Sequence, residues 1–293
     1  MGFLSYGSWY YYKYYYDQHN GKLDGNSYIP LTLTNKKKIS PDTVQLRLQL
    51  NKNQLPDIGT TTSGEQPYPV PSCVYIKDDN IQIMRPYTPI NPNPYKDGFI
   101  DLIVKRYPGG SVSRTLFAFP LNESIFIRGP MIEEYQYESN TKDEIGMIAG
   151  GTGISPMYQM IQHILTDPND DETTKLWLIY ANKTEDDILL KKELDQLEKE
   201  YAHRFKIKYV IEYPSEDWQG EKGRISETII RSMLYDETSK KNADDHKRFI
   251  FVSGPDGMLN FICGQRALDY SQGELSGLLA KLGLKSNEVW KFQ

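Results

Sequence analysis

Apolar residues alternate with polar ones in short runs up to about residue 140, and beyond it they form continuous runs separated by longer helical patterns. The first pattern, with its turns rich in glycine and proline, is typical of a small antiparallel β-barrel. The second predicts an α/β domain built on a doubly wound parallel sheet. We therefore expect an aromatic-rich segment at residues 1–27, a barrel domain at 28–140 and an α/β domain at 144–293.

The individual elements follow from the same patterns. We expect strands of the barrel at 43–50, 72–77, 98–106 and 123–127. In the α/β domain we expect strands at 145–149, 176–181, 205–211 and 249–252, and helices at 157–165, 188–201, 226–234 and 257–267.

A glycine-rich turn joins the first strand of the α/β domain to its first helix. Residues 150–156 read Gly-Gly-Thr-Gly-Ile-Ser-Pro, and we expect Ser155 to be the N-cap of the helix and Pro156 to lie in its first turn. Backbone N–H groups in such a turn can hold a pyrophosphate at the positive end of the helix. The spacing differs from G-x-G-x-x-G, and an ordinary strand–helix joint is an alternative interpretation.

Two further motifs carry candidate chemistry. Residues 85–89 read Arg-Pro-Tyr-Thr-Pro, where Arg85 can bind phosphate oxygens, Tyr87 can pack on a planar ring and Thr88 can donate to a ring atom. Residues 253–258 read Ser-Gly-Pro-Asp-Gly-Met and follow an apolar strand, at the edge of the sheet where ligands of α/β domains bind. Taken alone, each motif has an ordinary structural interpretation. Arg85 could be a surface charge and Tyr87 a core residue, and residues 253–258 could be a plain turn between a strand and a helix.

Composition narrows the class of protein. The chain has 293 residues, enough for two cores, and 34 basic against 39 acidic residues give a net charge of −5, which gives no signal for nucleic-acid binding. The two cysteines, Cys73 and Cys263, have no histidine at metal-ligand spacing, so we expect no metal and a reducing compartment. We expect no transmembrane segment, since no apolar run reaches the roughly 18–20 residues that span a bilayer.

Tyrosines crowd the first twenty positions of the chain, together with Phe3 and Trp9. One interpretation is a loosely ordered tail or one that packs on its own domain. The other is a segment that contacts a membrane surface, because aromatic rings favour the headgroup region.

The motifs, in this order, resemble the NADH-cytochrome b5 reductases, a family of ferredoxin reductase-like flavoproteins. The resemblance extends from about residue 28 to residue 292, and its matching stretches are residues 30–33, 85–89, 98–105, 127–130, 146–157 and 181–190. It implies a barrel that binds FAD and an α/β domain that binds NADH, with both rings meeting where the domains adjoin. The implied reaction takes a hydride from NADH and passes single electrons to a cytochrome b5-like haem protein.

Two other interpretations stay open. The same half-reaction could serve a different acceptor, such as a quinone or an iron–sulfur protein, or the chain could be a flavin-binding scaffold with weakened hydride transfer. The resemblance also implies a place on the cytoplasmic side of the endoplasmic reticulum or the mitochondrial outer membrane, or in the cytoplasm itself. A haem protein with an acidic face would need a basic rim, for which the candidates are Lys36, Lys37, Lys38, Lys105, Arg106 and Arg114.

The resemblance assigns roles by position. It implies catalytic roles for Thr88, Lys105 and Ser253. Residues that it implies in cofactor binding are Arg85, Pro86, Tyr87, Thr88, Ile103, Lys105, Tyr107, Gly110, Val112, Ser113, Gly150, Gly151, Thr152, Gly153, Ser155, Glu212, Gly254, Pro255 and Met258.

More than one interpretation is open at three of these positions. Ser253 replaces a cysteine that is usual in the family, which leaves the rate of hydride transfer in question. Ser113 suits a phosphate contact, a helix N-cap before residues 115–119, or both. Glu212 follows a strand, where a carboxylate can accept hydrogen bonds from a ribose diol and repel a 2′-phosphate, so it predicts a preference for NADH; an exposed strand-end charge is the alternative.

Overall fold

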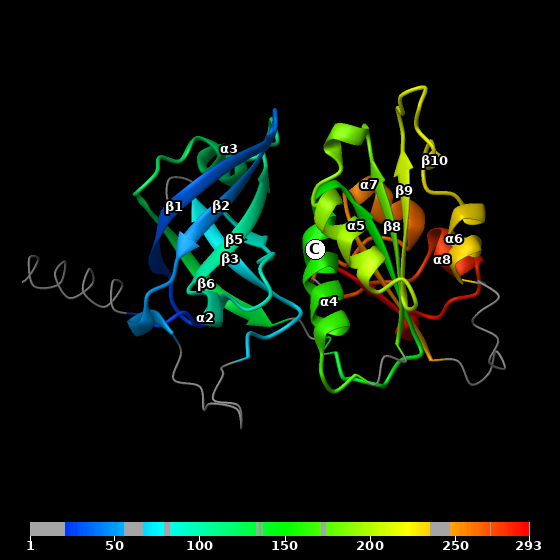
Figure 1. Ribbon diagram of the computed structural model, residues 1–293, viewed down its shortest axis with the longest axis horizontal. Coiled ribbons are helices and arrows are strands. Elements are labelled where there is room, and N and C mark those ends of the chain that lie inside the picture. The colour runs from blue at the N-terminus through cyan, green and yellow to red at the C-terminus, as the bar shows by residue number, and fades with distance from the viewer. Residues whose placement is uncertain are drawn as a thin grey trace, which may run out of the picture. The chain divides into compact units, whose positions relative to one another are not determined.

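The computed structural model describes residues 21–55, 67–78, 83–132, 135, 137–170, 174–234, 247–269 and 271–292. The chain divides into two compact units, Met1–Glu134 and Tyr135–Gln293. Each contains one six-stranded sheet, formed by β1–β6 in the first unit and by β7–β12 in the second (Figure 1). The tyrosine-rich stretch at 1–20 lies outside the described residues.

The first unit is an antiparallel sheet, as predicted. Its strands, in the order β4-β3-β6-β1-β2-β5, are β1 (Ile29–Ser40), β2 (Thr43–Gln49), β3 (Ser72–Asp78), β4 (Ile83–Tyr87), β5 (Phe99–Lys105) and β6 (Ser124–Ile132). Alternate side chains of these strands, such as Leu31, Leu33 and Leu46, are buried and form one core. The period-two pattern of the sequence therefore identifies the buried face.

The loop after β4 connects the two ends of this sheet. The N–H of Ile90 donates to the carbonyl of Asp101 in β5 at 2.9 Å, and the N–H of Asp101 donates to Asn91 Oδ1 at 3.0 Å. These bonds bring the end strands together, as the predicted barrel requires. Two short helices, α2 (Pro94–Asp97) and α3 (Ser111–Ala118), flank β5 in the sequence.

Residues 21–27 pack onto the first unit. Leu23 is fully buried and its N–H donates to the Gln54 carbonyl at 2.7 Å. The carbonyl of Asp24 accepts a bond of 2.9 Å from the N–H of Gly129. The described end of the predicted N-terminal segment is thus part of the barrel domain.

The second unit contains a parallel sheet with the order β10-β9-β8-β7-β11-β12. Its strands are β7 (Glu144–Gly150), β8 (Lys175–Asn182), β9 (Phe205–Ile211), β10 (Glu221–Lys222), β11 (Arg248–Ser253) and β12 (Val289–Lys291). The chain starts at β7, proceeds to one side through β8 and β9, and then returns to place β11 on the other side of β7. Beyond the carboxyl ends of β7 and β11 lies the topological switch point of the sheet, where ligands of such folds bind.

Helices cover both faces of the parallel sheet, as a doubly wound fold requires. They are α4 (Ile154–Thr166), α5 (Lys191–Glu200), α6 (Glu227–Leu234), α7 (Asp256–Ile262) and α8 (Gly277–Lys281). Residues of α6, α7 and α8 form one core with the inward side chains of β7, β8, β9 and β11. Figure 1 shows α4 on the side of this sheet opposite α6 and α8.

Two predicted helix boundaries are wrong for local backbone reasons. The helix expected at 188–201 begins at Lys191, because residues 185–187 form a 3₁₀ turn and Leu190 has a positive φ of 58°. The helix expected at 257–267 ends at Ile262, because Gly264 reverses the chain with a φ of +82°.

The end of the chain packs into the second unit. Phe292 is buried, and its ring stacks on Phe251 at a centroid distance of 5.5 Å. Tyr135, the first described residue of this unit, stacks on Phe249 at 4.6 Å and lies 6.1 Å from the Trp290 ring. Core packing is therefore the role of the terminal aromatic residues. Among the described residues, no helix has both the length and the hydropathy that a membrane crossing needs.

Candidate functional site

The glycine loop of the second unit, defined here as residues 150–155, lies at the switch point. Strand β7 ends at Gly150, residues Gly151–Gly153 form a 3₁₀ turn, and α4 begins at Ile154. Gly151 has a φ of +54°, and a Cβ built on it would meet open space. A left-handed glycine with open space beside it, just before a helix, leaves room for an anion to approach the backbone, as binding of a pyrophosphate would require.

The predicted N-cap is wrong. Gly153 occupies the cap position, with φ −60° and ψ −6°, so the helical backbone starts two residues earlier than a Ser155 cap would allow. Ser155 is the second residue of α4 and is buried. Pro156 lies in the first turn, as predicted. The 3₁₀ turn explains the shift, because it feeds directly into the helix.

The motif at 253–258 packs directly against the glycine loop. A Cβ on Gly153 would lie 2.3 Å from the Ser253 carbonyl oxygen, and a Cβ on Gly254 would lie 3.2 Å from the Gly150 nitrogen. The Sδ of Met258 would lie 2.5 Å from a Cβ on Gly150. The two segments therefore meet backbone to backbone, which only glycine permits at these positions. Ser253, at the end of β11, is buried beside this contact.

Tyr180 joins the glycine loop to the segment after β8. Its hydroxyl donates to the Gly151 carbonyl at 2.9 Å and accepts from the Leu189 N–H at 3.3 Å. The side chain is fully buried in β8. Tyr180 was not among the predicted site residues, because a tyrosine inside an apolar strand has the same pattern as a core residue.

Glu212 follows β9, as predicted, and is held by Arg224. Arg224 Nε and Nη2 donate to the same carboxylate oxygen at 2.9 and 2.7 Å. The hydrogen bond and the charge of Arg224 hold the pKa of Glu212 below its usual range. Arg224 was not among the predicted site residues, and no pattern in the sequence links it to Glu212.

The predicted flavin residues gather at the end of β4 and in the segment after β5. Arg85 is exposed on β4 and its Nη1 donates to the Met84 carbonyl at 2.9 Å. Tyr87, the last residue of β4, is half-buried against the core of the unit, and burial raises the pKa of its phenol. Tyr107 lies in the segment after β5, and its side chain is exposed.

The segment 107–113 forms a closed turn at the start of α3. The Tyr107 N–H donates to Ser113 Oγ, and Ser113 Oγ donates to the Gly110 carbonyl, both at 3.3 Å. Helix α3 begins at Ser111 with Gly110 as its cap, so the predicted N-cap role of Ser113 is wrong. Serine at the third helical position bonds back to the turn instead. The first N–H groups of α3, including that of Val112, remain as anion donors.

Two other predicted residues lie on β5. Ile103 is buried within the strand. Lys105 ends the strand and its Nζ lies 3.4 Å from Asp42 Oδ2. Pro86 pairs with Tyr75 of β3, and Thr88 directly follows β4.

Within the described residues, no group of three or more histidine, cysteine or acidic side chains is placed to hold a metal ion.

Three of the six basic residues that were candidates for a rim facing a haem protein make contacts within the first unit. Lys36 Nζ donates to the carbonyls of Phe117 and Phe119, and it lies 5.9 Å from the centre of the Phe117 ring. Arg106 lies 4.8 Å from the centre of the same ring, and Lys105 pairs with Asp42. Lys37, Lys38, Arg106 and Arg114 are the exposed members of the set, and of these Arg106 contacts the Phe117 ring.

Comparison with known proteins supports both units. Residues 30–137 match the family described as "Oxidoreductase FAD-binding domain", and residues 147–264 match "Oxidoreductase NAD-binding domain". In solved structures, the chain is similar to the cytochrome b5 reductase domain of Ulva prolifera nitrate reductase. That similarity has a TM-score of 0.72 at 28% identity and covers 92% of this chain and 99% of that one.

Sequence relatives point to the same family of reductases. The chain is 42% identical over 210 residues to "NADH-cytochrome b5 reductase 2" of Aspergillus oryzae, an alignment that covers 72% of this chain but only 62% of that protein's length. It is 37% identical over 269 residues to the protein of the same name in Neosartorya fischeri, which covers 90% of this chain and 77% of that relative. With its FAD-binding and NAD-binding domains in this order, the chain belongs to the NADH-cytochrome b5 reductase family.

Proposed function

We propose that this protein is an FAD-dependent oxidoreductase that takes a hydride from NADH and passes single electrons to a cytochrome b5-like haem protein. The observation that carries the proposal is the contact between the glycine loop and residues 253–258. It joins two predicted nucleotide-binding segments at the switch point of the parallel sheet. The names of the curated relatives support the acceptor.

In the first unit, Arg85 and the N-terminus of α3 are the groups that suit the FAD pyrophosphate. Arg85 offers an exposed guanidinium, and the first turn of α3 offers backbone N–H groups. Tyr87 and Tyr107 would flank the flavin and keep water from it, and Thr88 would donate a hydrogen bond to the ring. FAD, once bound, accepts a two-electron hydride and releases electrons one at a time, which suits a one-electron haem acceptor.

In the second unit, the glycine loop would hold the pyrophosphate of NADH through backbone N–H groups, with Thr152 adding a hydroxyl. Glu212 would accept hydrogen bonds from the adenosine ribose diol. Ser253 would lie beside the nicotinamide, where it is buried and small enough to admit the ring. These residues bind and orient the donor, and the chemistry is that of the two cofactors.

The test uses the purified full chain. Visible absorption before and after anaerobic NADH should show an oxidised flavin that bleaches, and the reduced protein should then reduce cytochrome b5. A protein that cannot be loaded with FAD would refute the proposal, and one that stays oxidised with NADH would indicate a flavin-binding scaffold. Bleaching with reduction of a quinone or an iron–sulfur protein, and none of cytochrome b5, would identify another acceptor.

For the compartment, we propose the cytoplasm or the cytoplasmic side of an intracellular membrane. Cys73 and Cys263 are both buried and are not joined in a disulfide, which is consistent with a reducing environment. Contact of the N-terminal aromatic segment with a membrane surface stays a prediction, which binding of the full chain to lipid vesicles would test against a variant lacking residues 1–20.

A further inference from the structure

The charges around Glu212 are unusual for a site that must reject a phosphate. Arg224 follows Gly223, whose N–H donates to the Ile211 carbonyl at 2.7 Å, so the segment after β10 is fixed against the end of β9. From there, Arg224 bonds one carboxylate oxygen of Glu212 twice, at 2.9 and 2.7 Å. The Arg224 side chain is nevertheless 81% exposed, against 23% for Glu212.

A second cation lies beside the pair. Residues 212 and 213 are bonded to the end of β8, with the Glu212 N–H donating to the Asn182 carbonyl at 3.0 Å and the Tyr213 N–H to the Lys183 carbonyl at 2.8 Å. Lys183 is exposed, and this backbone pairing places it beside residues 212 and 213. The acid that is proposed to bind the ribose of the donor is therefore bonded by one base and has a second base on the neighbouring segment.

The net charge of the groups around the proposed ribose site decides whether it accepts NADH alone or NADPH as well. A lone carboxylate repels a 2′-phosphate, whereas an arginine near it accommodates one. A guanidinium has five N–H groups and the bond to Glu212 uses two of them, so Arg224 can hold Glu212 and a phosphate together.

We propose that Arg224 and Lys183 form a subsite for the 2′-phosphate of NADPH, so that NADPH is a second donor beside NADH. The inference rests on the proposed function, in which Glu212 binds the adenosine ribose. In the overall reaction NADPH is oxidised to NADP⁺, two one-electron acceptors are each reduced by one electron, and one proton is released.

The chain offers a matched control for Arg224. Arg231 on α6 makes the same contact, with Nε and Nη2 bonding one carboxylate oxygen of Glu227 at 2.8 and 2.7 Å. That pair lies within one exposed helix face and is not part of the proposed site. Replacing either arginine by glutamine removes one charge and two hydrogen bonds, and only Arg224→Gln removes them from the ribose subsite.

The experiment measures kcat/KM for NADPH and for NADH with ferricyanide as acceptor, which removes any dependence on the haem protein. We expect the native protein to use both donors. In Arg224→Gln the ratio of the NADPH value to the NADH value should fall by about tenfold or more, as loss of charge-assisted hydrogen bonds predicts. Lys183→Gln should lower the ratio in the same direction, and Arg231→Gln should leave it unchanged. Added salt should weaken NADPH use more than NADH use.

An unchanged ratio in Arg224→Gln, or an equal fall in Arg231→Gln, would overturn the subsite. So would a native protein that NADH reduces and millimolar NADPH does not. A flavin that neither donor reduces would instead refute the proposed function, and the inference with it.

Discussion

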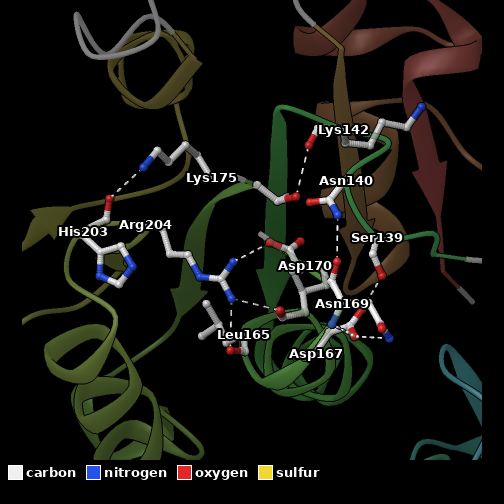
Figure 2. A network of polar contacts seen from close by, with 12 residues as sticks. Ser139, Asn140, Lys142, Leu165, Asp167, Asn169, Asp170, Lys175, His203 and Arg204 are labelled. Carbon is white, nitrogen blue, oxygen red and sulfur yellow. Dashed lines mark hydrogen bonds and ion pairs between the residues drawn. The ribbon is translucent and has the colours of Figure 1, made fainter. Parts of the chain in front are cut away.

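Arg204 and Asp170 form an ion pair of 2.8 Å in which both side chains are almost wholly excluded from solvent (Figure 2). The second guanidinium nitrogen of Arg204 donates to the carbonyls of Ile164 and Leu165 at 3.1 and 3.0 Å, and so satisfies the last turn of α4. The hydroxyl of Tyr137 donates to the other Asp170 oxygen at 2.6 Å. The pair therefore fixes the end of the helix whose start is the glycine loop.

Replacing Arg204 with leucine should lower the free energy of unfolding by about 3–5 kcal/mol, because it leaves the buried Asp170 carboxylate without its counter-charge. Chemical denaturation measures the change. The control is Lys191→Ala, which removes an exposed pair with Asp195 and should cost less than about 1 kcal/mol. Equal losses of unfolding free energy in the two variants would show that burial does not make the Arg204–Asp170 pair more important for stability than an exposed pair.

His163 should make stability depend on pH. Its ring is half-buried and lies edge-on to that of Tyr137, with 5.8 Å between the ring centroids, and burial lowers its pKa below the ordinary value of 6.5. The unfolded chain then takes up a proton at a higher pH than the native one, so stability is full above pH 6.5 and falls as the pH decreases toward the native pKa.

Stability should therefore rise with pH in that window, with a slope below the limit of about 1.4 kcal/mol per pH unit for a single group. Urea denaturation between pH 7 and pH 5.5 measures it. In His163→Gln this contribution should vanish, while the exposed His203→Gln should keep it. A native-like slope in His163→Gln would assign the pH dependence to other groups.

Gly153→Ala should weaken NADH binding without loss of FAD. The new Cβ would lie 2.3 Å from the Ser253 carbonyl oxygen, so the glycine loop and residues 253–258 must separate. Overpacking of about 1–3 kcal/mol predicts a rise of about tenfold in the KM for NADH. Gly257→Ala is the control, since its Cβ would meet nothing within 4 Å, and its KM should be native. Steady-state kinetics and flavin absorbance provide the two readouts.

Tyr180→Phe should raise the KM for NADH several-fold with little change in kcat, because the lost hydrogen bond of about 1 kcal/mol holds the carbonyl of Gly151 in place. The control is Tyr209→Phe, because Tyr209 lies opposite Tyr180 on β9. Its hydroxyl donates to Asp195 of α5 and makes no bond to the glycine loop in the part of the chain that the structure describes. We expect both variants to lose similar stability and only Tyr180→Phe to change KM. A matching rise in KM for Tyr209→Phe would reduce the role of Tyr180 to general stability.

Arg85→Ala should release FAD. A charge-assisted contact to phosphate is worth about 1.5–3 kcal/mol, so the dissociation constant of FAD should rise by roughly tenfold or more. The flavin-to-protein absorbance ratio after gel filtration measures retention, and Lys37→Ala, an exposed charge on β1, is the control. Native flavin content in Arg85→Ala would refute the assigned role.

The sequence predicted the fold class and the position of the glycine loop because strand periodicity and glycine placement are local signals. The placement of residues 253–258 at the same edge of the sheet as the glycine loop also followed, since parallel strands end at one edge of a sheet. The predicted caps at Ser155 and Ser113 were wrong because the helices begin after Gly153 and Gly110, whose backbone conformations set the helix starts whatever the capping preference of the later serines. Arg224 and Tyr180 were missed because their roles come from partners that only the folded chain brings near.

The sheet order has a consequence for how the protein is made. Strand β7 lies beside β11, and Arg248 bonds Glu144 across 104 positions of the chain. During synthesis the glycine loop therefore leaves the ribosome long before its partner Ser253, and contacts of such high sequence separation form late and slowly. If NADH binds both segments, as proposed, it stabilises a contact that can form only after β11 has been made. The donor would then also be a ligand that favours folding, and a chain interrupted before β11 would lack the second of the two segments.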